Sequence, residues 1–132
     1  MIALDANVLA RYVVRDEPRQ TAAATRLIES SCTPESPGVV SLIVLAELVW
    51  VLARGYRYRR PQITTVLRTM LSADDIRVER AELAWQALNL YEGGEADFAD
   101  YLIGLIGREE KAEATYTFDR RATSSPLFKL VR

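Results

Sequence analysis

The chain has 132 residues, of which 17 are Lys or Arg and 18 are Asp or Glu, and its formal net charge is -1. This length supports one hydrophobic core and predicts a single domain over residues 1–132. Histidine is absent, which excludes imidazole bases, Ser-His-Asp triads and histidine-bound zinc, and the lone Cys32 excludes an internal disulfide. Any chemistry must therefore come from carboxylates, hydroxyls, basic side chains or a bound ion.

The hydropathy pattern gives no sign of a membrane segment. The longest apolar run, residues 39–53, contains Glu47 and is shorter than the roughly 18 to 20 residues that span a bilayer. The first predicted strand begins near Met1, which leaves no room for a signal peptide. We therefore expect a cytoplasmic protein.

Strands and helices are predicted to alternate from the start of the chain. An apolar strand over residues 2–4 ends at Asp5, and Asn7 can cap the helix that follows. A second helix is predicted over residues 18–30, with its first turn marked by proline. Residues 32–38, which include two prolines, are predicted to form a loop.

The alternation continues to the end of the chain and defines the fold class. A short strand over residues 39–40 leads to Ser41, a candidate N-cap for a helix that ends at Gly55. The remaining predicted elements are helices over 61–71, 81–91 and 97–109 and strands over 76–78, 115–118 and 128–131. This order predicts an α/β fold with a mostly parallel five-stranded sheet covered by helices on both faces.

Four carboxylates interrupt or end apolar segments, where a buried charge would be costly: Asp5, Glu47, Asp100 and Asp119. Each lies just after a predicted strand or near the start of a helix, as does Asp97. Functional side chains of parallel α/β sheets gather at the carboxyl ends of the strands, so we expect these acids at one edge. With no obvious buried basic partner, they predict a shared divalent cation, and oxygen ligands favour Mg²⁺ or Mn²⁺.

Two glycines extend the stripe that carries Asp97 and Asp100 along the helix predicted over residues 97–109. Glycine inside a helix costs about 1 kcal/mol relative to alanine. Gly104 and Gly107 therefore indicate that this helix packs closely on the sheet and brings its acidic end toward Asp5, unless they are merely tolerated.

Each acid also has a structural explanation. Asp5 and Asp97 could serve as helix caps, and Asp119 could form an exposed ion pair with Arg120 or Arg121. That all the acids should be structural by coincidence is the weaker explanation.

Four ordered segments resemble the PIN domain family, and more narrowly the VapC-type toxins of bacterial toxin–antitoxin modules: residues 2–9, 41–50, 97–103 and 117–121. The resemblance covers essentially the whole chain. It implies a PIN-like three-layer sandwich and a magnesium-dependent endoribonuclease kept inactive by a small antitoxin. Relatives often carry Thr or Ser where this chain has Ala6, a change that leaves every acidic position in place.

The resemblance also implies roles for individual residues. It places the catalytic and metal-binding acids at Asp5, Glu47, Asp100 and Asp119, an accessory acid at Asp97, and polar helpers at Asn7 and Ser41. Three of the acids are expected as ligands, whereas Glu47 is either a ligand or the group that orients the attacking water. Whether one ion or two operate, and whether Asp97 is a ligand or a cap, stays open.

Other functions compete with this interpretation. A catalytically idle PIN-fold binding or scaffold module would keep the fold and lose an acid, yet all four acids are present. An aspartate-nucleophile phosphatase, or a receiver domain, would require a lysine positioned at its active site, and the only lysines are Lys111 and Lys129.

The expected partners are a cognate antitoxin, an RNA substrate and a second copy of the chain in a homodimer. A mixture of aromatic and basic side chains matches either a protein interface or an RNA-contacting rim: Trp50, Arg54, Tyr56, Arg57, Tyr58, Arg59 and Arg60. Trp50 could instead belong to the core. The sequence does not indicate which RNA is cut, or where.

Overall fold

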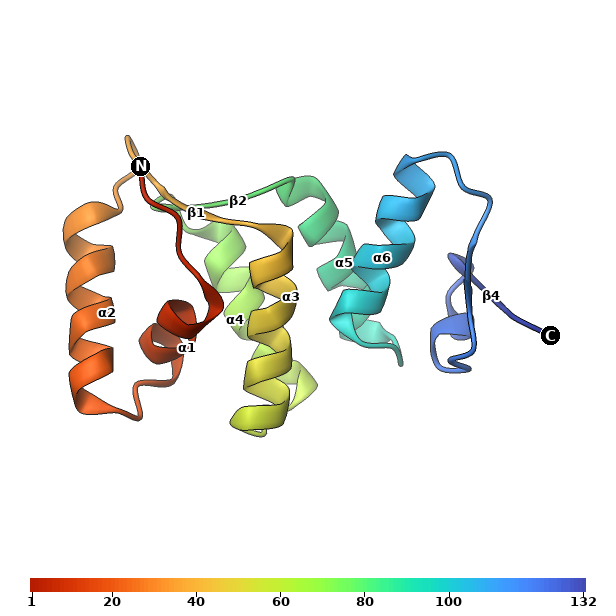
Figure 1. The fold of residues 1–132 in the computed structure, drawn as a ribbon, viewed down its shortest axis with the longest axis horizontal. Coiled ribbons are helices and arrows are strands. Elements are labelled where there is room, and N and C mark those ends of the chain that lie inside the picture. The colour runs from red at the N-terminus through yellow and green to blue at the C-terminus, as the bar shows by residue number, and fades with distance from the viewer. The chain divides into compact units, whose positions relative to one another are not determined.

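Groups of helices are separated by short strands along residues 1–132, all of which this computed structural model describes (Figure 1). The chain divides into two compact units, Met1–Ala81 and Glu82–Arg132. A single domain over residues 1–132 therefore stays a prediction. No helix is long and apolar enough to cross a membrane.

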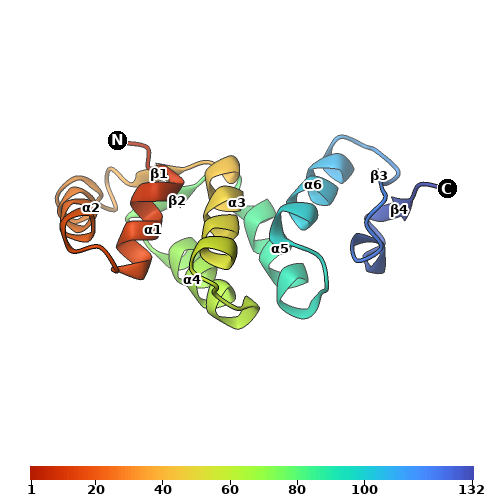
Figure 2. The same ribbon diagram turned by 60° about the horizontal axis from the view of Figure 1, so that its bottom comes forward.

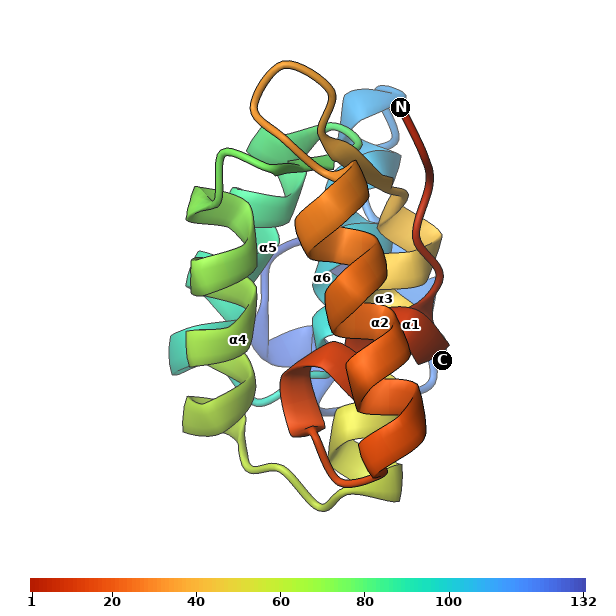
Figure 3. The same ribbon diagram turned by 90° about the vertical axis from the view of Figure 1, so that its left-hand side faces the viewer.

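The first unit holds four α-helices and a short parallel ladder. Its elements are α1 (Ala6–Val14), α2 (Pro18–Ser31), β1 (Gly38–Val40), α3 (Leu42–Trp50), the π-helix η1 (Val51–Gly55), α4 (Arg60–Ser72) and β2 (Ile76–Val78). The strands β1 and β2 pair in parallel, and Ala3 forms one further parallel bridge with Val39. Helix α1 packs against both α2 and α3 (Figures 2 and 3).

The core of this unit explains why its helices form. Leu9 of α1, Leu45 and Leu48 of α3 and Leu67 of α4 are all at most 1% exposed. Val40, on the pairing strand β1, is also fully buried. Apolar side chains at helical spacing thus place one face of each helix against a shared core, which is the main source of helix stability in proteins.

The second unit contains two α-helices and a second parallel ladder. Its elements are α5, which begins at the unit boundary (Ala81–Gly93), α6 (Phe98–Glu109), β3 (Thr115–Thr117), the 3-10 helix η2 (Ala122–Ser124) and β4 (Phe128–Leu130). Phe98 is fully buried, and its ring meets that of Tyr91 edge-to-face at 5.9 Å between centroids.

The glycines of α6 allow the close helix packing that the sequence predicts. A Cβ atom added to Gly104 would lie 2.9 Å from Phe128 and 3.0 Å from Leu127. One added to Gly107 would lie 2.9 Å from the hydroxyl of Thr115. Larger residues at either position would push α6 away from the strands, so the prediction of tight packing on the strands is confirmed.

The predicted five-stranded sheet is not confirmed. All five predicted strand segments form parallel pairings, but they make two two-stranded ladders and one isolated bridge. The physical reason is strand length, because three-residue strands provide few ladder hydrogen bonds and leave most of the stabilisation to helix packing. An α/β fold with parallel strand pairing is retained.

Candidate active site

Asp5 lies between the extended segment at the start of the chain and helix α1. The N–H of Leu4 donates to the carbonyl of Val39 at 2.9 Å, which holds the segment beside β1. The Asp5 carboxylate caps α1 by accepting the Val8 N–H at 3.0 Å. The prediction that Asn7 caps this helix is wrong. Asn7 lies in the first turn, and the Asp5 carboxylate already accepts the otherwise unpaired N–H of Val8.

Ser41 caps α3 as predicted, since its hydroxyl accepts the Val44 N–H at 3.1 Å. A second acid, Glu79, accepts the N–H of Leu42 at 2.9 Å. Glu79 directly follows β2, which is the same sequence signal that identifies Asp5, yet it is not among the predicted site residues. Together these contacts fix the start of the helix that carries Glu47.

Glu47 is exposed on α3, although it interrupts an apolar run. Ile43 and Trp50 lie on the same helical face and are 80% and 62% exposed. The premise that these acids are buried is therefore wrong: Asp5 and Glu47 are exposed, and Asp100 and Asp119 are partly exposed. An exposed acid costs little to keep charged, so its presence does not by itself demand a cation.

Arg121 lies close to two of the predicted acids of the second unit, and a backbone hydrogen bond connects the third to them. Asp97 is the N-cap residue of α6, and its N–H donates to a carboxylate oxygen of Asp100 at 3.2 Å. The Arg121 guanidinium lies 3.5 Å from Asp119 and 3.8 Å from Asp97. An exposed ion pair between Asp119 and Arg121 was one predicted alternative, whereas the contact with Asp97 was missed because 24 positions separate the two residues.

The loop after β3 orients Asp119. The Arg121 N–H donates to Asp119 Oδ1 at 2.9 Å, while the Asp119 N–H donates to the Thr117 hydroxyl at 3.0 Å. These bonds to its own neighbours hold the carboxylate at the end of the strand, where the sequence places it.

The two carboxyls respond differently to their surroundings. Burial raises the pKa of Asp100, the neighbouring charges of Asp97 and Asp119 add to the rise, and the Asp97 N–H opposes it. The hydrogen bond from the Arg121 N–H, followed by its guanidinium, lowers the pKa of Asp119. Asp119 therefore keeps its charge readily, whereas burial and the neighbouring acids disfavour the charged form of Asp100.

The structure thus connects Asp97, Asp100 and Asp119 within the second unit, and it places Asp5, Ser41 and Glu47 on neighbouring elements of the first. No group of three or more acidic or cysteine side chains in residues 1–132 is arranged to hold a metal ion. The gathering of all acids at one edge requires residues from both units and stays a prediction.

Comparison with known proteins identifies the family. The PIN domain family model matches residues 2–124, so the chain belongs to the PIN domain family. The match spans all four acidic positions. Among curated proteins, the VapC ribonuclease of Aquifex aeolicus (strain VF5) is 26% identical over 121 residues, which are 92% of this chain and 89% of that protein. The resemblance to VapC-type PIN domains is confirmed.

A solved structure is also similar. The crystal structure of Mycobacterium tuberculosis VapC20, described as a sarcin-ricin loop cleaving toxin, is 25% identical to this chain. The match covers 94% of each chain with a TM-score of 0.47.

Proposed function

We propose that this protein is a metal-dependent endoribonuclease of the VapC type and acts as the toxin of a toxin–antitoxin module. The observation that carries the proposal is the similarity to a VapC ribonuclease over 92% of the chain. The family match spans Asp5, Glu47, Asp100 and Asp119, the four acids that the chemistry needs. We propose Mg²⁺ as the ion, with Mn²⁺ as a substitute.

The residues present fit a hard divalent cation. Their donor atoms are carboxylate oxygens, with a hydroxyl and an amide nearby in sequence, and no histidine or thiolate accompanies them. The pKa of Asp100 is raised in part by two neighbouring acids, a repulsion that a cation would relieve. Arg121 already supplies a positive charge to this cluster, which supports the proposal.

Each side chain then has a distinct task. Asp5, Asp100 and Asp119 would provide the ligands, directly or through water, and Glu47 would bind the ion or accept a hydrogen bond from the attacking water. The accessory Asp97 orients Asp100 through its N–H, Ser41 supports the start of its helix, and Asn7 is the remaining polar helper. A bound divalent cation makes water a better nucleophile and stabilises charge on the phosphate, so hydrolysis needs no histidine.

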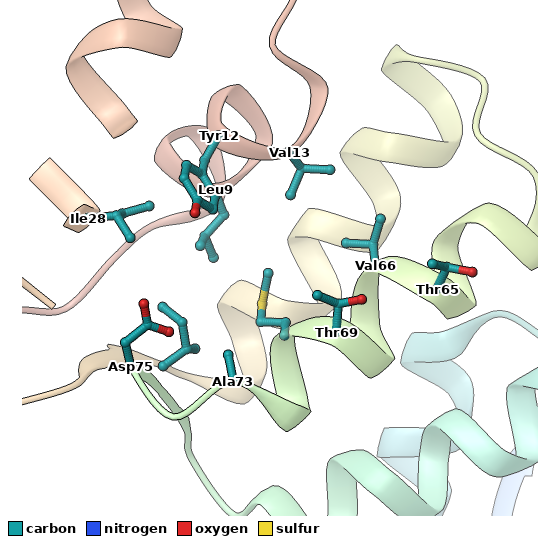
Figure 4. A pocket seen from close by; sticks show the side chains of 11 residues that line it. Leu9, Tyr12, Val13, Ile28, Thr65, Val66, Thr69, Ala73 and Asp75 are labelled. Carbon is teal, nitrogen blue, oxygen red and sulfur yellow. The ribbon is translucent and has the colours of Figure 1, made fainter. Parts of the chain in front are cut away.

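An apolar groove in the first unit is a suitable site for the expected antitoxin. It has a volume of about 280 Å³, and side chains from α1 and α4 face each other across it, including Leu9, Tyr12 and Val66 (Figure 4). An amphipathic helix could fill such a groove, and an arginine of the same partner could compete with the metal for the carboxylates.

We propose that the toxin itself is a homodimer.

Magnesium should stabilise the free protein. A ligand that binds only the folded state raises the melting temperature by mass action, so we expect an upward shift in millimolar Mg²⁺. Asp100→Asn should reduce this shift and leave the metal-free protein at least as stable, because a repulsion is removed. Differential scanning fluorimetry with and without Mg²⁺ measures both effects, and an unchanged wild-type melting curve would contradict the metal proposal.

Arg121→Gln should strengthen metal binding, because the guanidinium competes with a cation for Asp97 and Asp119. Both partners are exposed, so we expect a modest effect, roughly two- to fivefold in the Mg²⁺ concentration for half-maximal stabilisation. Arg120→Gln is the matched control, since it removes the same charge one position away. Equal effects of the two substitutions would show that only net charge matters.

The proposed activity is tested by incubating the purified protein with total RNA and Mg²⁺ and mapping the new ends. We expect specific internal cuts that disappear when EDTA is added. RNA that stays intact with Mg²⁺ and with Mn²⁺ would instead support the catalytically idle binding module.

A further inference from the structure

Positive charge is concentrated in one part of the chain. Between Glu47 and Asp74 there is no acidic residue, and the interval contains five arginines, Arg54, Arg57, Arg59, Arg60 and Arg68. The remainder of the chain consequently carries a net charge of -6. Such segregation creates a local positive potential on an otherwise acidic protein.

The segment between η1 and α4 is held in a defined conformation. The N–H of Tyr58 donates to the carbonyl of Leu52 at 2.9 Å, and the Tyr56 hydroxyl accepts a hydrogen bond from Arg11 at 3.1 Å. Both tyrosines are partly buried, while Arg57 between them is exposed and has a positive φ of 57°. The anchored tyrosines thus present the arginine outward.

Three of the arginines are available to a ligand. Arg54, Arg57 and Arg59, which we call the arginine rim, are exposed and form no ion pair with any carboxylate in residues 1–132. Arg59 is the N-cap residue of α4, where the helix dipole adds further positive potential. Unpaired guanidinium groups are suited to phosphate because each can donate two parallel hydrogen bonds.

The rim continues the exposed face that carries Glu47. Trp50 and Arg54 follow Glu47 at spacings of three and seven residues, which place all three on one side of a continuous helical segment. Arg54 lies in the π-helix η1, roughly two turns beyond Glu47. Trp50 lies between them and is 62% exposed.

We propose that the arginine rim and Trp50 bind the single-stranded RNA that flanks the scissile phosphate. The arginines contact successive backbone phosphates, and an unstacked base lies on the Trp50 ring. This inference rests on the proposed ribonuclease function and adds to it the surface that holds the substrate. The contacts are to backbone and to a base face, so they supply affinity more than sequence preference.

The test measures binding of a fluorescein-labelled single-stranded RNA to the uncleaving Asp5→Asn protein, by fluorescence anisotropy at several salt concentrations. Substituting all three rim arginines with glutamine should raise the dissociation constant at least about tenfold at low salt. It should also reduce the slope of log K against log salt by about 2, or about 0.7 per lost phosphate contact. Trp50→Leu should weaken binding without changing the slope, because it removes stacking but no charge.

The matched control removes three exposed basic charges elsewhere, with Arg19→Gln, Arg26→Gln and Arg132→Gln combined. This control should lose far less affinity than the rim variant. Equal losses in the two triple variants would overturn the proposal. So would an unchanged RNA affinity accompanied by a change in oligomeric state on sizing, which would make the rim a protein interface.

Cleavage assays separate this inference from the proposed function. With Asp5 intact, the rim variant should raise KM and leave kcat near the wild-type value. A rim variant that cleaves with wild-type KM would overturn the RNA surface while supporting the nuclease. RNA binding through the rim in a wild-type protein that never cleaves would support the RNA surface and contradict the nuclease. The absence of RNA binding by any form of the protein would contradict both proposals.

Discussion

Replacing Asp5 with asparagine should reduce the rate of RNA cleavage by at least about 10²- to 10³-fold, the usual cost of removing one group that stabilises charge in the transition state. Asparagine caps helices as well as aspartate does, so it can still accept the Val8 N–H that now bonds to Asp5. The loss should therefore appear in kcat and metal affinity while the fold remains. Single-turnover cleavage of a labelled RNA measures it.

Asp74→Asn provides the matched control, because it removes the same charge from an exposed turn before β2. We expect wild-type cleavage from this control and an unchanged melting temperature for both variants in the absence of metal. An Asp5→Asn protein that cleaves at the wild-type rate would exclude the proposed chemistry.

The largest expected effect on stability comes from Phe98, the first residue of α6. Its side chain is fully buried and packs edge-to-face on Tyr91, so Phe98→Ala should destabilise the protein by about 3–5 kcal/mol. Phe98→Leu keeps most of the buried volume and should cost less than about 1.5 kcal/mol. Urea denaturation followed by circular dichroism gives both values.

Similar losses for the two Phe98 substitutions would show that ring volume is not what stabilises this helix start. A small loss for Phe98→Ala would mean that α6 is not packed as the structure describes. The result bears on function, because Asp97 and Asp100 flank this residue in the sequence and share the same helix start.

Local signals predicted most of the elements. Pro18 opens α2, Ser41 caps α3, and the glycine stripe packs α6 on its strands, because each of these effects depends on residues close in the chain or on the size of one side chain. The residues that follow strands were also placed correctly, since a strand must end where its apolar run ends.

Effects that depend on distant residues were less predictable. Glu47 interrupts an apolar run and yet lies on an exposed face. This exposure was not predicted, because periodicity alone does not reveal which side of α3 lacks a neighbour. The contact of Arg121 with Asp97 joins residues far apart in sequence, and no local pattern signals it. The five-stranded sheet was inferred from alternation, which counts strands but does not determine which ones pair.

Arg121 supplies a positive charge to the proposed site when no metal is bound. Its guanidinium bridges Asp97 and Asp119, and it also opposes the rise in the pKa of Asp100. In this state the arginine partly replaces the cation. An antitoxin arginine would use the same interaction from outside, which connects inhibition to the electrostatics of the free protein.

Asp5 and Asp119 are proposed to bind the same divalent cation, and Mn²⁺ binding tests this claim most directly. Electron paramagnetic resonance titrations would measure Mn²⁺ affinity for the wild-type protein, Asp5→Asn and Asp119→Asn, with Asp74→Asn as the control. A shared site predicts that Asp5→Asn and Asp119→Asn each weaken binding by a similar large factor and that the control does not. Mn²⁺ affinity that falls in Asp119→Asn but stays at the wild-type value in Asp5→Asn would contradict the claim.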